Sequence, residues 1–286
     1  KKRRQVKGIS PHQFRLLTTS NGYIIAGSAN DGVYILNSQG LVIQHLTANR
    51  PNGFNSNTIS SLCEWNGHLL IGCINGNLAS YNLKTGNFEK KELTTPVGID
   101  NNSLTISSII ADKHHNLWIG TLRHGIIKTY QKGKIFRYIR NKGQKAMTSF
   151  CNDGKGNLWA GSDGNGLYII TGEKSLTTNY NQGQAIPHIR YRECELWIAN
   201  WGNGVTIKEQ DSRKEQQIKN LPGNGVHDVL PVKGGAWIAI DNYGLVYYDR
   251  RTNSTLYAKN SKIPVFNTRW GQFPTQLMQD HKGRIW

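Results

Sequence analysis

The distribution of apolar and polar residues along the chain repeats itself. Each copy has an apolar triplet, a small residue, a short polar or glycine-rich stretch, and then glycine followed by a second apolar run. The copies cover residues 24–36, 69–81, 117–130, 158–170, 196–208, 236–248 and, as a beginning only, 284–286. Short apolar runs separated by turn residues are typical of strands, and self-similarity at a fixed period indicates a repeat architecture.

The spacing of the copies narrows the choice of architecture. The second position of each copy recurs every 38 to 49 residues, and a period of about 40 to 50 residues is typical of propeller blades. The third copy shows four strand-like runs, at residues 106–111, 117–121, 125–130 and 134–139. We therefore predict an all-β, seven-bladed β-propeller with four-stranded antiparallel blades, the last of them incomplete in this fragment.

The predicted organisation is a single propeller over residues 1–286. Blades are expected near residues 12–45, 58–92, 104–140, 146–180, 186–219, 226–259 and 274–286. The seventh copy stops early in its second strand, so we expect the chain to be a fragment and to gain stability from one further hairpin. Residues 1–9 are expected to close the ring by pairing with the last blade, which would remove an exposed strand edge.

The tryptophans and cysteines have expected structural roles. Five of the eight tryptophans occupy the second position of a copy, and we expect these large rings to fill the wedges between neighbouring blades. They are Trp118, Trp159, Trp197, Trp237 and Trp286. The four cysteines form no CxxC motif, and we expect all four to be buried as small apolar residues. They are Cys63, Cys73, Cys151 and Cys194.

Charge adds one observation about ligands. The 286 residues carry 35 Lys and Arg against 18 Asp and Glu, a formal net charge of +17. Residues 113–152 contain no acidic residue, so one side of the disc should be basic. This surface has two interpretations, a repelling face that keeps the protein soluble or a field that attracts sulfated or uronic glycans. Binding of nucleic acid is a weaker third interpretation, because no nucleic-acid-binding motif is present.

Three segments carry a resemblance to a known family. Residues 112–121 (DKHHNLWIGT), 153–162 (DGKGNLWAGS) and 280–286 (DHKGRIW) resemble the two-component regulator propeller repeat, as do the upstream stretches 53–62 and 101–109. The resemblance extends over nearly the whole chain and is most specific in blades three and four. It implies the extracytoplasmic sensor of a hybrid histidine kinase or a related regulator, commonly from Bacteroidetes, which detects glycans and induces genes for their use.

Location and partners follow from the resemblance. It implies a periplasmic or other extracytoplasmic portion of an inner-membrane protein, with the membrane and output segments outside this fragment. No uninterrupted apolar stretch approaches the roughly 18 residues of a membrane span, and no signal peptide opens the sequence. The expected partners are an oligosaccharide or other small ligand, the rest of the sensor chain and a second copy in a homodimer. No cofactor and no metal are expected.

Other propeller functions remain as alternatives. A protein-interaction scaffold is the main one, although no Trp-Asp dipeptide of the WD-repeat type is present. A glycoside hydrolase would need two converging carboxylates, and no convincing pair stands out. A streptogramin-lyase-like enzyme would need a histidine-centred acid or base. The adjacent His114 and His115 are expected to be solvated in a turn, because no other ligand has zinc-like spacing. We therefore expect no enzymatic activity in this fragment.

Blade geometry predicts where a ligand would bind. The turn between the second and third strands lies on the same face as the connector into the next blade, and loops on a rigid scaffold often carry recognition. Flat aromatic rings beside amides and charges suit sugars. The candidates are Arg123, His124, Asp163, Asn165, Trp201, Asn203, Asp241 and Tyr243 in the turns, and Lys145, His188, His227, Arg269 and Trp270 in the connectors. If the rim is basic, Arg123 and Lys145 should favour anionic oligosaccharides, most strongly at low salt.

Overall fold

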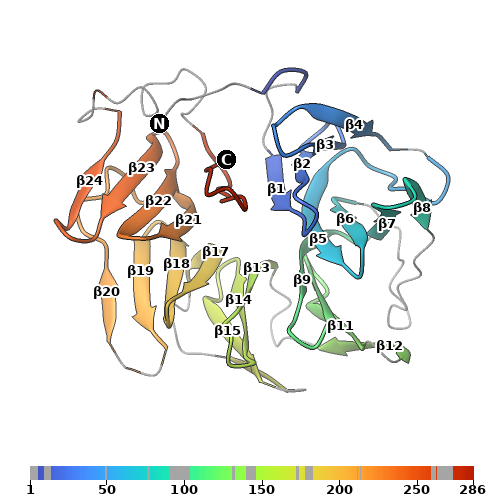
Figure 1. The fold of residues 1–286 in the computed structure, drawn as a ribbon. Helices are drawn as coiled ribbons and strands as arrows, with labels where there is room; N and C mark the ends of the chain where they lie inside the picture. The colour runs from blue at the N-terminus through green and yellow to red at the C-terminus, as the bar shows by residue number, and fades with distance from the viewer. Residues whose placement is uncertain are drawn as a thin grey trace.

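The computed structural model describes residues 6–9, 14–48, 50–75, 78–89, 104–130, 133–139, 146–171, 174–177, 183–210, 212, 214–258, 262 and 273–286. Within these residues all regular secondary structure is β-strand (Figure 1). None of these segments forms a helix with the length and apolarity needed to cross a membrane.

The strands in the described part of the chain form six four-stranded antiparallel sheets, each built from four strands that are consecutive in the sequence. The first sheet contains β1 (Phe14–Thr18), β2 (Ile24–Ser28), β3 (Val33–Leu36) and β4 (Val42–Leu46), and the second contains β5 (Ile59–Trp65), β6 (His68–Cys73), β7 (Leu78–Asn82) and β8 (Asn87–Glu89). The third contains β9 (Ile106–Ala111), β10 (Leu117–Thr121), β11 (Ile126–Tyr130) and β12 (Gly133–Ile139), and the fourth contains β13 (Met147–Asn152), β14 (Leu158–Ser162), β15 (Leu167–Thr171) and β16 (Lys174–Thr177). The fifth contains β17 (Ala185–Arg192), β18 (Glu195–Trp201), β19 (Gly204–Glu209) and β20 (Glu215–Gln217), and the sixth contains β21 (Val226–Val232), β22 (Gly235–Ile240), β23 (Gly244–Asp249) and β24 (Ser254–Leu256).

Burial changes across each sheet and explains the repeated sequence pattern. The second strands β2, β10 and β14 are buried along their whole length, because neighbouring sheets cover both of their faces. A strand covered on both faces is a continuous apolar run instead of an alternating one. The fourth strand β20 is exposed throughout. The copies found in the sequence therefore mark the buried middle strands of each sheet.

Glycines in the second strands allow the sheets to approach closely. A Cβ atom added at Gly72 would lie 2.6 Å from Cγ2 of Ile106, and one added at Gly27 would lie 2.5 Å from Cγ2 of Ile59. Both isoleucines belong to the first strand of the following sheet, so a side chain at either glycine would collide with it. The fully buried Ala199 takes the same place in the fifth sheet.

The wedges between neighbouring sheets are filled with apolar side chains. Trp118 of the third sheet packs with Met147 and Phe150 of the fourth, and the wedges on either side are built in the same way. Trp118, Trp159 and Trp197 are all buried, with at most 7% of their surface exposed. The expected packing role of these three tryptophans is confirmed. Trp237 and Trp286 are partly buried.

The C-terminal segment 273–286 lies between the sixth and first sheets (Figure 1). Leu277 packs against Leu230 and Ala239 of the sixth sheet, whereas Met278 packs against Ile24 of the first. The backbone amides of Met278 and Trp286 donate to each other's carbonyls at 3.0 and 2.8 Å, which begins an antiparallel pairing. The sheets and this segment together surround a centre, as in a propeller.

The sequence predicts a seventh blade at the C-terminal end and ring closure by the N-terminal residues, and the structure describes part of each. In the seventh blade expected near residues 274–286, the structure describes no full strand, and the pairing begins with the bridge between Gln279 and Ile285. Of the residues expected to close the ring, Val6 and Ile9 pack against the apolar cluster of the first sheet, and residues 1–5 lie outside the described residues. Ring closure by this segment therefore stays a prediction.

The expectation that all four cysteines are buried is wrong for Cys194. Cys63, Cys73 and Cys151 are buried, and burial raises the pKa of each thiol to about 12. Cys194 is exposed because it lies in the tight turn between β17 and β18, where its φ is 64°. A left-handed turn residue at the edge of a sheet points to solvent and cannot join an apolar wedge.

Candidate functional site

The turns and connectors meet on one face of the protein, as the sequence predicts. The amide of Asp163, after β14, donates to the carbonyl of Ala146 just before β13, at 2.9 Å, and the amide of Asp241 donates to Gly225 at 2.8 Å. The amide of Gly202 reaches Asn224, which precedes the next sheet, at 2.9 Å. We call this side, with the turns that follow each second strand and the residues that precede each first strand, the connector face.

Three of the predicted site residues come together on this face. Trp201 and His227 have ring centroids 4.9 Å apart, and Nε2 of His227 lies 3.6 Å from Oδ1 of Asp241. Trp201 is 44% exposed. A Cβ added at Gly225 would lie 3.2 Å from the Cβ of Asp241 and 3.5 Å from the Trp201 ring. We call Trp201, His227 and Asp241 the tryptophan–histidine cluster.

Local strand geometry positions each member of this cluster. Trp201 ends β18, and Asp241 directly follows β22. His227 lies in β21 where the register shifts between Val226 and Asp228, and such a bulge re-aims a side chain. The Asp241 carboxylate also accepts a hydrogen bond of 2.8 Å from Nδ2 of Asn242. The cluster is therefore a product of the fifth and sixth sheets together.

The chemistry of the cluster suits a ring-shaped ligand that carries hydroxyl groups. A partly exposed indole offers a flat apolar surface, the carboxylate accepts hydrogen bonds, and the imidazole can donate or accept one. Aromatic surface beside a few polar groups is typical of small-molecule sites. Within the described ranges, no three His, Cys, Asp or Glu side chains are placed to hold a metal ion.

The other predicted turn residues are spread around the connector face. Arg123 and His124 lie in the β10–β11 turn of the third sheet, and Asp163 and Asn165 lie in the β14–β15 turn of the fourth. Tyr243 packs in a T-shaped contact with Tyr257, with centroids 6.4 Å apart. Asn203 accepts hydrogen bonds from Nε2 of Gln217 on its carbonyl and on Oδ1, at 2.9 and 3.1 Å. Lys145, Arg269 and Trp270 lie outside the described residues.

Two predicted connector residues are not in connectors. His188 lies within β17 and His227 within β21, because the pairing of both first strands starts earlier in the chain, at Ala185 and Val226. The imidazole of His188 contacts Asp228 and is not part of the tryptophan–histidine cluster. The structure thus separates two histidines that the sequence grouped together.

The residues around His188 form an ionic site around a buried carboxylate, and sequence reasoning missed this arrangement. The Asp228 side chain is fully buried, and its Oδ2 lies 2.8 Å from Nη2 of Arg190 and accepts the amide of Leu277 at 2.8 Å. Oδ1 lies 2.9 Å from Nδ1 of His188 and accepts the amide of Val229 at 2.8 Å. Nη2 of Arg190 also donates to the carbonyl of Leu277 at 2.8 Å. We call His188, Arg190 and Asp228 the central ionic cluster.

Burial and pairing have opposite effects on the charges in this cluster. Burial alone would raise the pKa of Asp228, but Arg190 and His188 outweigh it and hold that pKa far below its ordinary value. Burial lowers the pKa of His188 in spite of the nearby carboxylate. In the sixth sheet, Asp228 lies opposite the small Ala239 of the second strand. The residues at the same position in the second, third and fourth sheets are Ser61, Ser108 and Ser149, and each lies opposite a glycine. A charged residue at that repeat position was the available signal.

Neighbouring first strands elsewhere are joined by neutral or single-cation contacts. The hydroxyls of Ser60, Ser107 and Thr148 donate to the carbonyls of Ile106, Met147 and Ile186 in the next sheet. Nε of Arg15 donates to the carbonyl of Ser60 at 3.0 Å. The amide of Leu16 donates to Oε1 of Gln276 at 2.7 Å. With the central ionic cluster, these contacts link each sheet to the next and the C-terminal segment to both of its neighbours.

The repeated Asp and Trp of the sequence motif are hydrogen-bonded to each other. The indole Nε1 of Trp118, Trp159 and Trp286 donates to the aspartate six residues earlier, at 2.9, 3.2 and 3.0 Å. The aspartates are Asp112, Asp153 and Asp280. Burial alone would raise the pKa of each carboxyl, but these hydrogen bonds and others within the turn lower it. The motif therefore fixes the turn between the first and second strands.

Comparison with known proteins places the fold. No family model matches the sequence, and no curated relative matches it. Among solved structures, the extracellular domain of BT4673 from B. thetaiotaomicron, assigned to a one-component system, is 16% identical with a TM-score of 0.58, and the match covers 95% of this chain and 43% of that one. A second structure of that domain, assigned to a hybrid two-component system, has 16% identity and a TM-score of 0.52 and covers 98% and 50%.

Two further solved structures widen the range of functions found on this fold. The Cps50 (Swd1) β-propeller domain of Myceliophteria thermophila is 14% identical with a TM-score of 0.65, covering 88% of each chain. A catalytically inactive variant of virginiamycin B lyase from Staphylococcus aureus, with quinupristin, is 16% identical with a TM-score of 0.60, covering 78% of this chain and 75% of that one. At these identities the likeness shows that the chain has a propeller fold. The chain spans no more than half of the BT4673 domain.

Proposed function

We propose that the chain is the ligand-sensing propeller of an extracytoplasmic signalling protein of the two-component type, and that it binds an oligosaccharide at the tryptophan–histidine cluster. The observation that carries this proposal is the exposed Trp201, which lies beside His227 and Asp241 on the connector face. An exposed aromatic ring with a carboxylate in reach suits the apolar face and the hydroxyls of a sugar. The propeller fold shared with BT4673 supports the signalling role as an analogy of fold.

The seven-bladed form of the propeller belongs to the same proposal. The segment 273–286 packs against the sixth sheet and the first, and it begins an antiparallel pairing between Met278 and Trp286. Trp286 bonds to Asp280 as Trp118 bonds to Asp112 in the third sheet. We infer that residues 273–286 are the inner part of a seventh blade.

Signalling would use binding energy and no chemistry within the disc. A ligand shifts a conformational equilibrium only when it binds one arrangement more tightly than the other. In this proposal a saccharide held between the fifth and sixth sheets favours one arrangement of the propeller with the rest of the sensor chain, or of two copies in a homodimer. The protein would lie in the periplasm as part of an inner-membrane protein.

A lyase is the second candidate function, because one observation favours it. His227 and Asp241 form a histidine–carboxylate pair beside an exposed aromatic ring, which is an arrangement that general acid or base chemistry can use. Virginiamycin B lyase shows that a similar fold supports such an enzyme. A scaffold for protein partners is the other alternative, and the exposed Trp201 would then be part of a protein interface.

The experiment is a glycan array probed with the protein, followed by product analysis of every saccharide that binds. The proposal expects at least one saccharide to bind and to be recovered unchanged after long incubation. A bound saccharide that is cleaved would favour the lyase. If no saccharide binds while a protein partner is captured tightly, the sensor proposal is wrong.

A further inference from the structure

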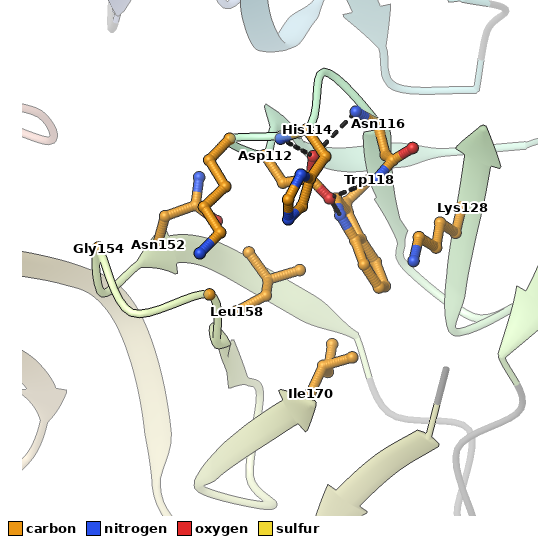
Figure 2. Close-up of a pocket in the computed structure, with 11 residues that line it drawn as sticks. Asp112, His114, Asn116, Trp118, Lys128, Asn152, Gly154, Leu158 and Ile170 are labelled. Carbon is orange, nitrogen blue, oxygen red and sulfur yellow. Dashed lines mark hydrogen bonds between the residues drawn. The ribbon is translucent and has the colours of Figure 1, made fainter. Parts of the chain in front are cut away.

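A cleft of about 170 Å³ lies between the third and fourth sheets, beside the turns that join their first and second strands (Figure 2). The carboxylate among its lining residues, Asp112, accepts hydrogen bonds from the indole of Trp118, from the amide of His114 and from Asn116. All of these contacts lie within one turn of the repeat. The carboxylate of this cleft is therefore explained by the repeated turn, whereas the charged groups nearest the centre of the protein are not.

One position of the repeat lies on the innermost strand of each sheet. It is the first-strand residue opposite the small residue of the second strand, and consecutive first strands are in contact from β1 to β21 (Figure 1). The residues at this position are Arg15, Ser61, Ser108, Ser149, His188 and Asp228. Gln276 takes this position in the C-terminal segment, because it lies two residues before Met278, which pairs with Trp286 as Ile110 pairs with Trp118. We call these residues the inner ring.

The inner ring has short side chains on one side of the protein and long polar side chains on the other. The second, third and fourth sheets have serine at this position, and the long polar residues are His188, Asp228, Gln276 and Arg15. Oδ2 of Asp228 accepts the amide of Leu277 at 2.8 Å, and Oε1 of Gln276 accepts the amide of Leu16 in the same way at 2.7 Å. The long side chains therefore form a continuous polar stretch from the fifth sheet to the first.

Arg15 is the residue of this stretch that has unused donors. In the second, third and fourth sheets, a hydroxyl one residue earlier links the sheet to the next. The first sheet has Phe14 at that place, and Nε of Arg15 makes the link to the carbonyl of Ser60 at 3.0 Å. Arg15 is exposed, and within the described residues its two terminal nitrogens have no hydrogen-bond partner. An arginine fork with free donors matches a carboxylate, sulfate or phosphate group.

The carboxylate of Asp228 does not face a ligand in the inner ring. Its side chain is fully buried, whereas the side chains of His188 and Arg190 are 23% and 28% exposed. Each carboxylate oxygen already contacts one of these two side chains and accepts one backbone amide. Burial lowers the pKa of His188 most, and the charges of Arg190 and Arg15 add to this effect. Arg15 is therefore an electrostatic neighbour of the central ionic cluster, and the exposed side chains around it carry no negative charge.

We propose that the inner ring binds a small oxyanion, which is a carboxylate, sulfate or phosphate group, between the guanidinium of Arg15 and the exposed parts of His188 and Arg190. The terminal nitrogens of Arg15 hold the anion by charge-assisted hydrogen bonds, which are stronger than neutral ones. The anion gives Arg15 the negative partner that Asp228 gives Arg190. None of the residues of the tryptophan–histidine cluster belongs to the inner ring, so this site is separate from the proposed saccharide site.

The test is a titration of the whole chain with sulfate, phosphate and acetate, at an ionic strength held constant with chloride. Binding is followed by calorimetry and by the NMR signal of the Nε–H group of Arg15. At least one oxyanion should bind once per chain and shift this signal. Arg15→Ser gives the first sheet the residue that three other sheets have at this position, so it should fold, and it should weaken binding by at least about tenfold, the value of one charged hydrogen bond. Arg15→Lys keeps the charge without the fork and should weaken binding less.

Arg251→Ser is the matched control, because Arg251 is an exposed arginine in the β23–β24 turn of the sixth sheet. This variant should bind the oxyanion as the unchanged protein does. The proposal is wrong if no oxyanion binds, or if one binds without shifting the Nε–H signal of Arg15. Equal weakening by Arg251→Ser and Arg15→Ser would show an adventitious ion only and would also overturn it. Binding of a neutral array saccharide at Trp201 should be unchanged in Arg15→Ser, so the outcome for each site can be read separately.

Discussion

From the second sheet to the fifth, neighbouring first strands are joined by single hydroxyl groups, whereas the fifth and sixth sheets and the C-terminal segment are joined by charged groups around the buried carboxylate of Asp228. Ser60, Ser107 and Thr148 each donate one hydrogen bond to a carbonyl of the next sheet. Arg190 and Asp228 instead contact each other and both backbone groups of Leu277. Neighbouring sheets are thus held together by neutral hydrogen bonds from the second sheet to the fifth, and by an ion pair between the fifth and sixth sheets.

The two kinds of contact differ in how much stability is lost when one partner is removed. A neutral hydrogen bond contributes about 1 kcal/mol to stability, and its loss leaves one carbonyl without a partner. A buried ion pair contributes little compared with an apolar replacement of both partners, but loss of one partner leaves an uncompensated charge. Because Asp228 and Arg190 bind the amide and carbonyl of Leu277 as a paired strand would, the ionic link fixes a segment that has few backbone pairs of its own.

The largest expected effect comes from breaking the ionic link. Asp228→Ala should lower the free energy of unfolding by about 3 kcal/mol, because the half-buried Arg190 and the amides of Val229 and Leu277 then lose their common acceptor. Chemical denaturation of the two proteins measures this change. Replacing Arg190 by Met in the same chain should recover part of the loss. A cost below about 1 kcal/mol for Asp228→Ala would mean that the cluster does not hold the ring together.

A smaller effect is expected from a neutral link. Thr148→Val keeps the shape of the side chain and removes the hydroxyl that donates to Ile186, so it should cost about 1 kcal/mol. The same denaturation experiment applies. If this variant were as unstable as Asp228→Ala, the contrast between the two sides of the ring would be incorrect.

The ionic side should also make stability depend on pH. Burial lowers the pKa of folded His188 from 6.5, so the unfolded chain binds its proton first and stability falls as pH drops below about 6.5. Asp228 has a depressed pKa in the folded state. Its contribution is therefore complete above the unfolded value of 3.8 and is lost at lower pH, towards the folded pKa. In His188→Gln, the midpoint of chemical denaturation should change less between pH 7.5 and pH 5 than it does in the unchanged protein. An equal pH dependence of the midpoint in the two proteins would contradict this account.

The smallest expected effect on stability concerns the binding face. Trp201 is 44% exposed, and exposed side chains away from buried networks change stability by no more than about 0.5 kcal/mol. Trp201→Ala should therefore unfold at nearly the same denaturant concentration as the unchanged protein. A loss comparable to that of Thr148→Val would indicate that Trp201 is a structural residue and not a binding one.

The sequence predicted the strands, which follow the repeated local pattern, and it missed the contacts between residues that are far apart in the chain. The four strands of the third sheet lie within one residue of their expected ends, because each strand is a local apolar run bounded by turn residues. Trp201 and Asp241 were placed on one face by the order of strands alone. The partners of Asp228 come from β17 and from residue 277, so they meet only where the fifth sheet, the sixth sheet and the C-terminal segment pack against one another.

Single side chains outside the repeat were the least predictable. Lys128 was one of nine basic residues in the stretch 113–152, and only its pairing across from Trp118 shows that its ammonium is buried beside an aromatic ring. His227 was expected in a connector and lies at a bulge, which sequence periodicity does not reveal. The basic rim expected around Arg123 and Lys145 stays a prediction, because Lys145 lies outside the described residues.

The most direct test of the proposed sensor site is calorimetric titration of a saccharide that binds on the array into three proteins. These are the unchanged chain, Trp201→Ala, and Leu41→Ala as a control that truncates an exposed apolar side chain on the first sheet, where Leu41 is 63% exposed. Removal of an aromatic anchor at the centre of a site should cost at least about tenfold in affinity. We expect that loss for Trp201→Ala and unchanged affinity for Leu41→Ala. Equal affinity for all three proteins would contradict the assignment of the site to Trp201, His227 and Asp241.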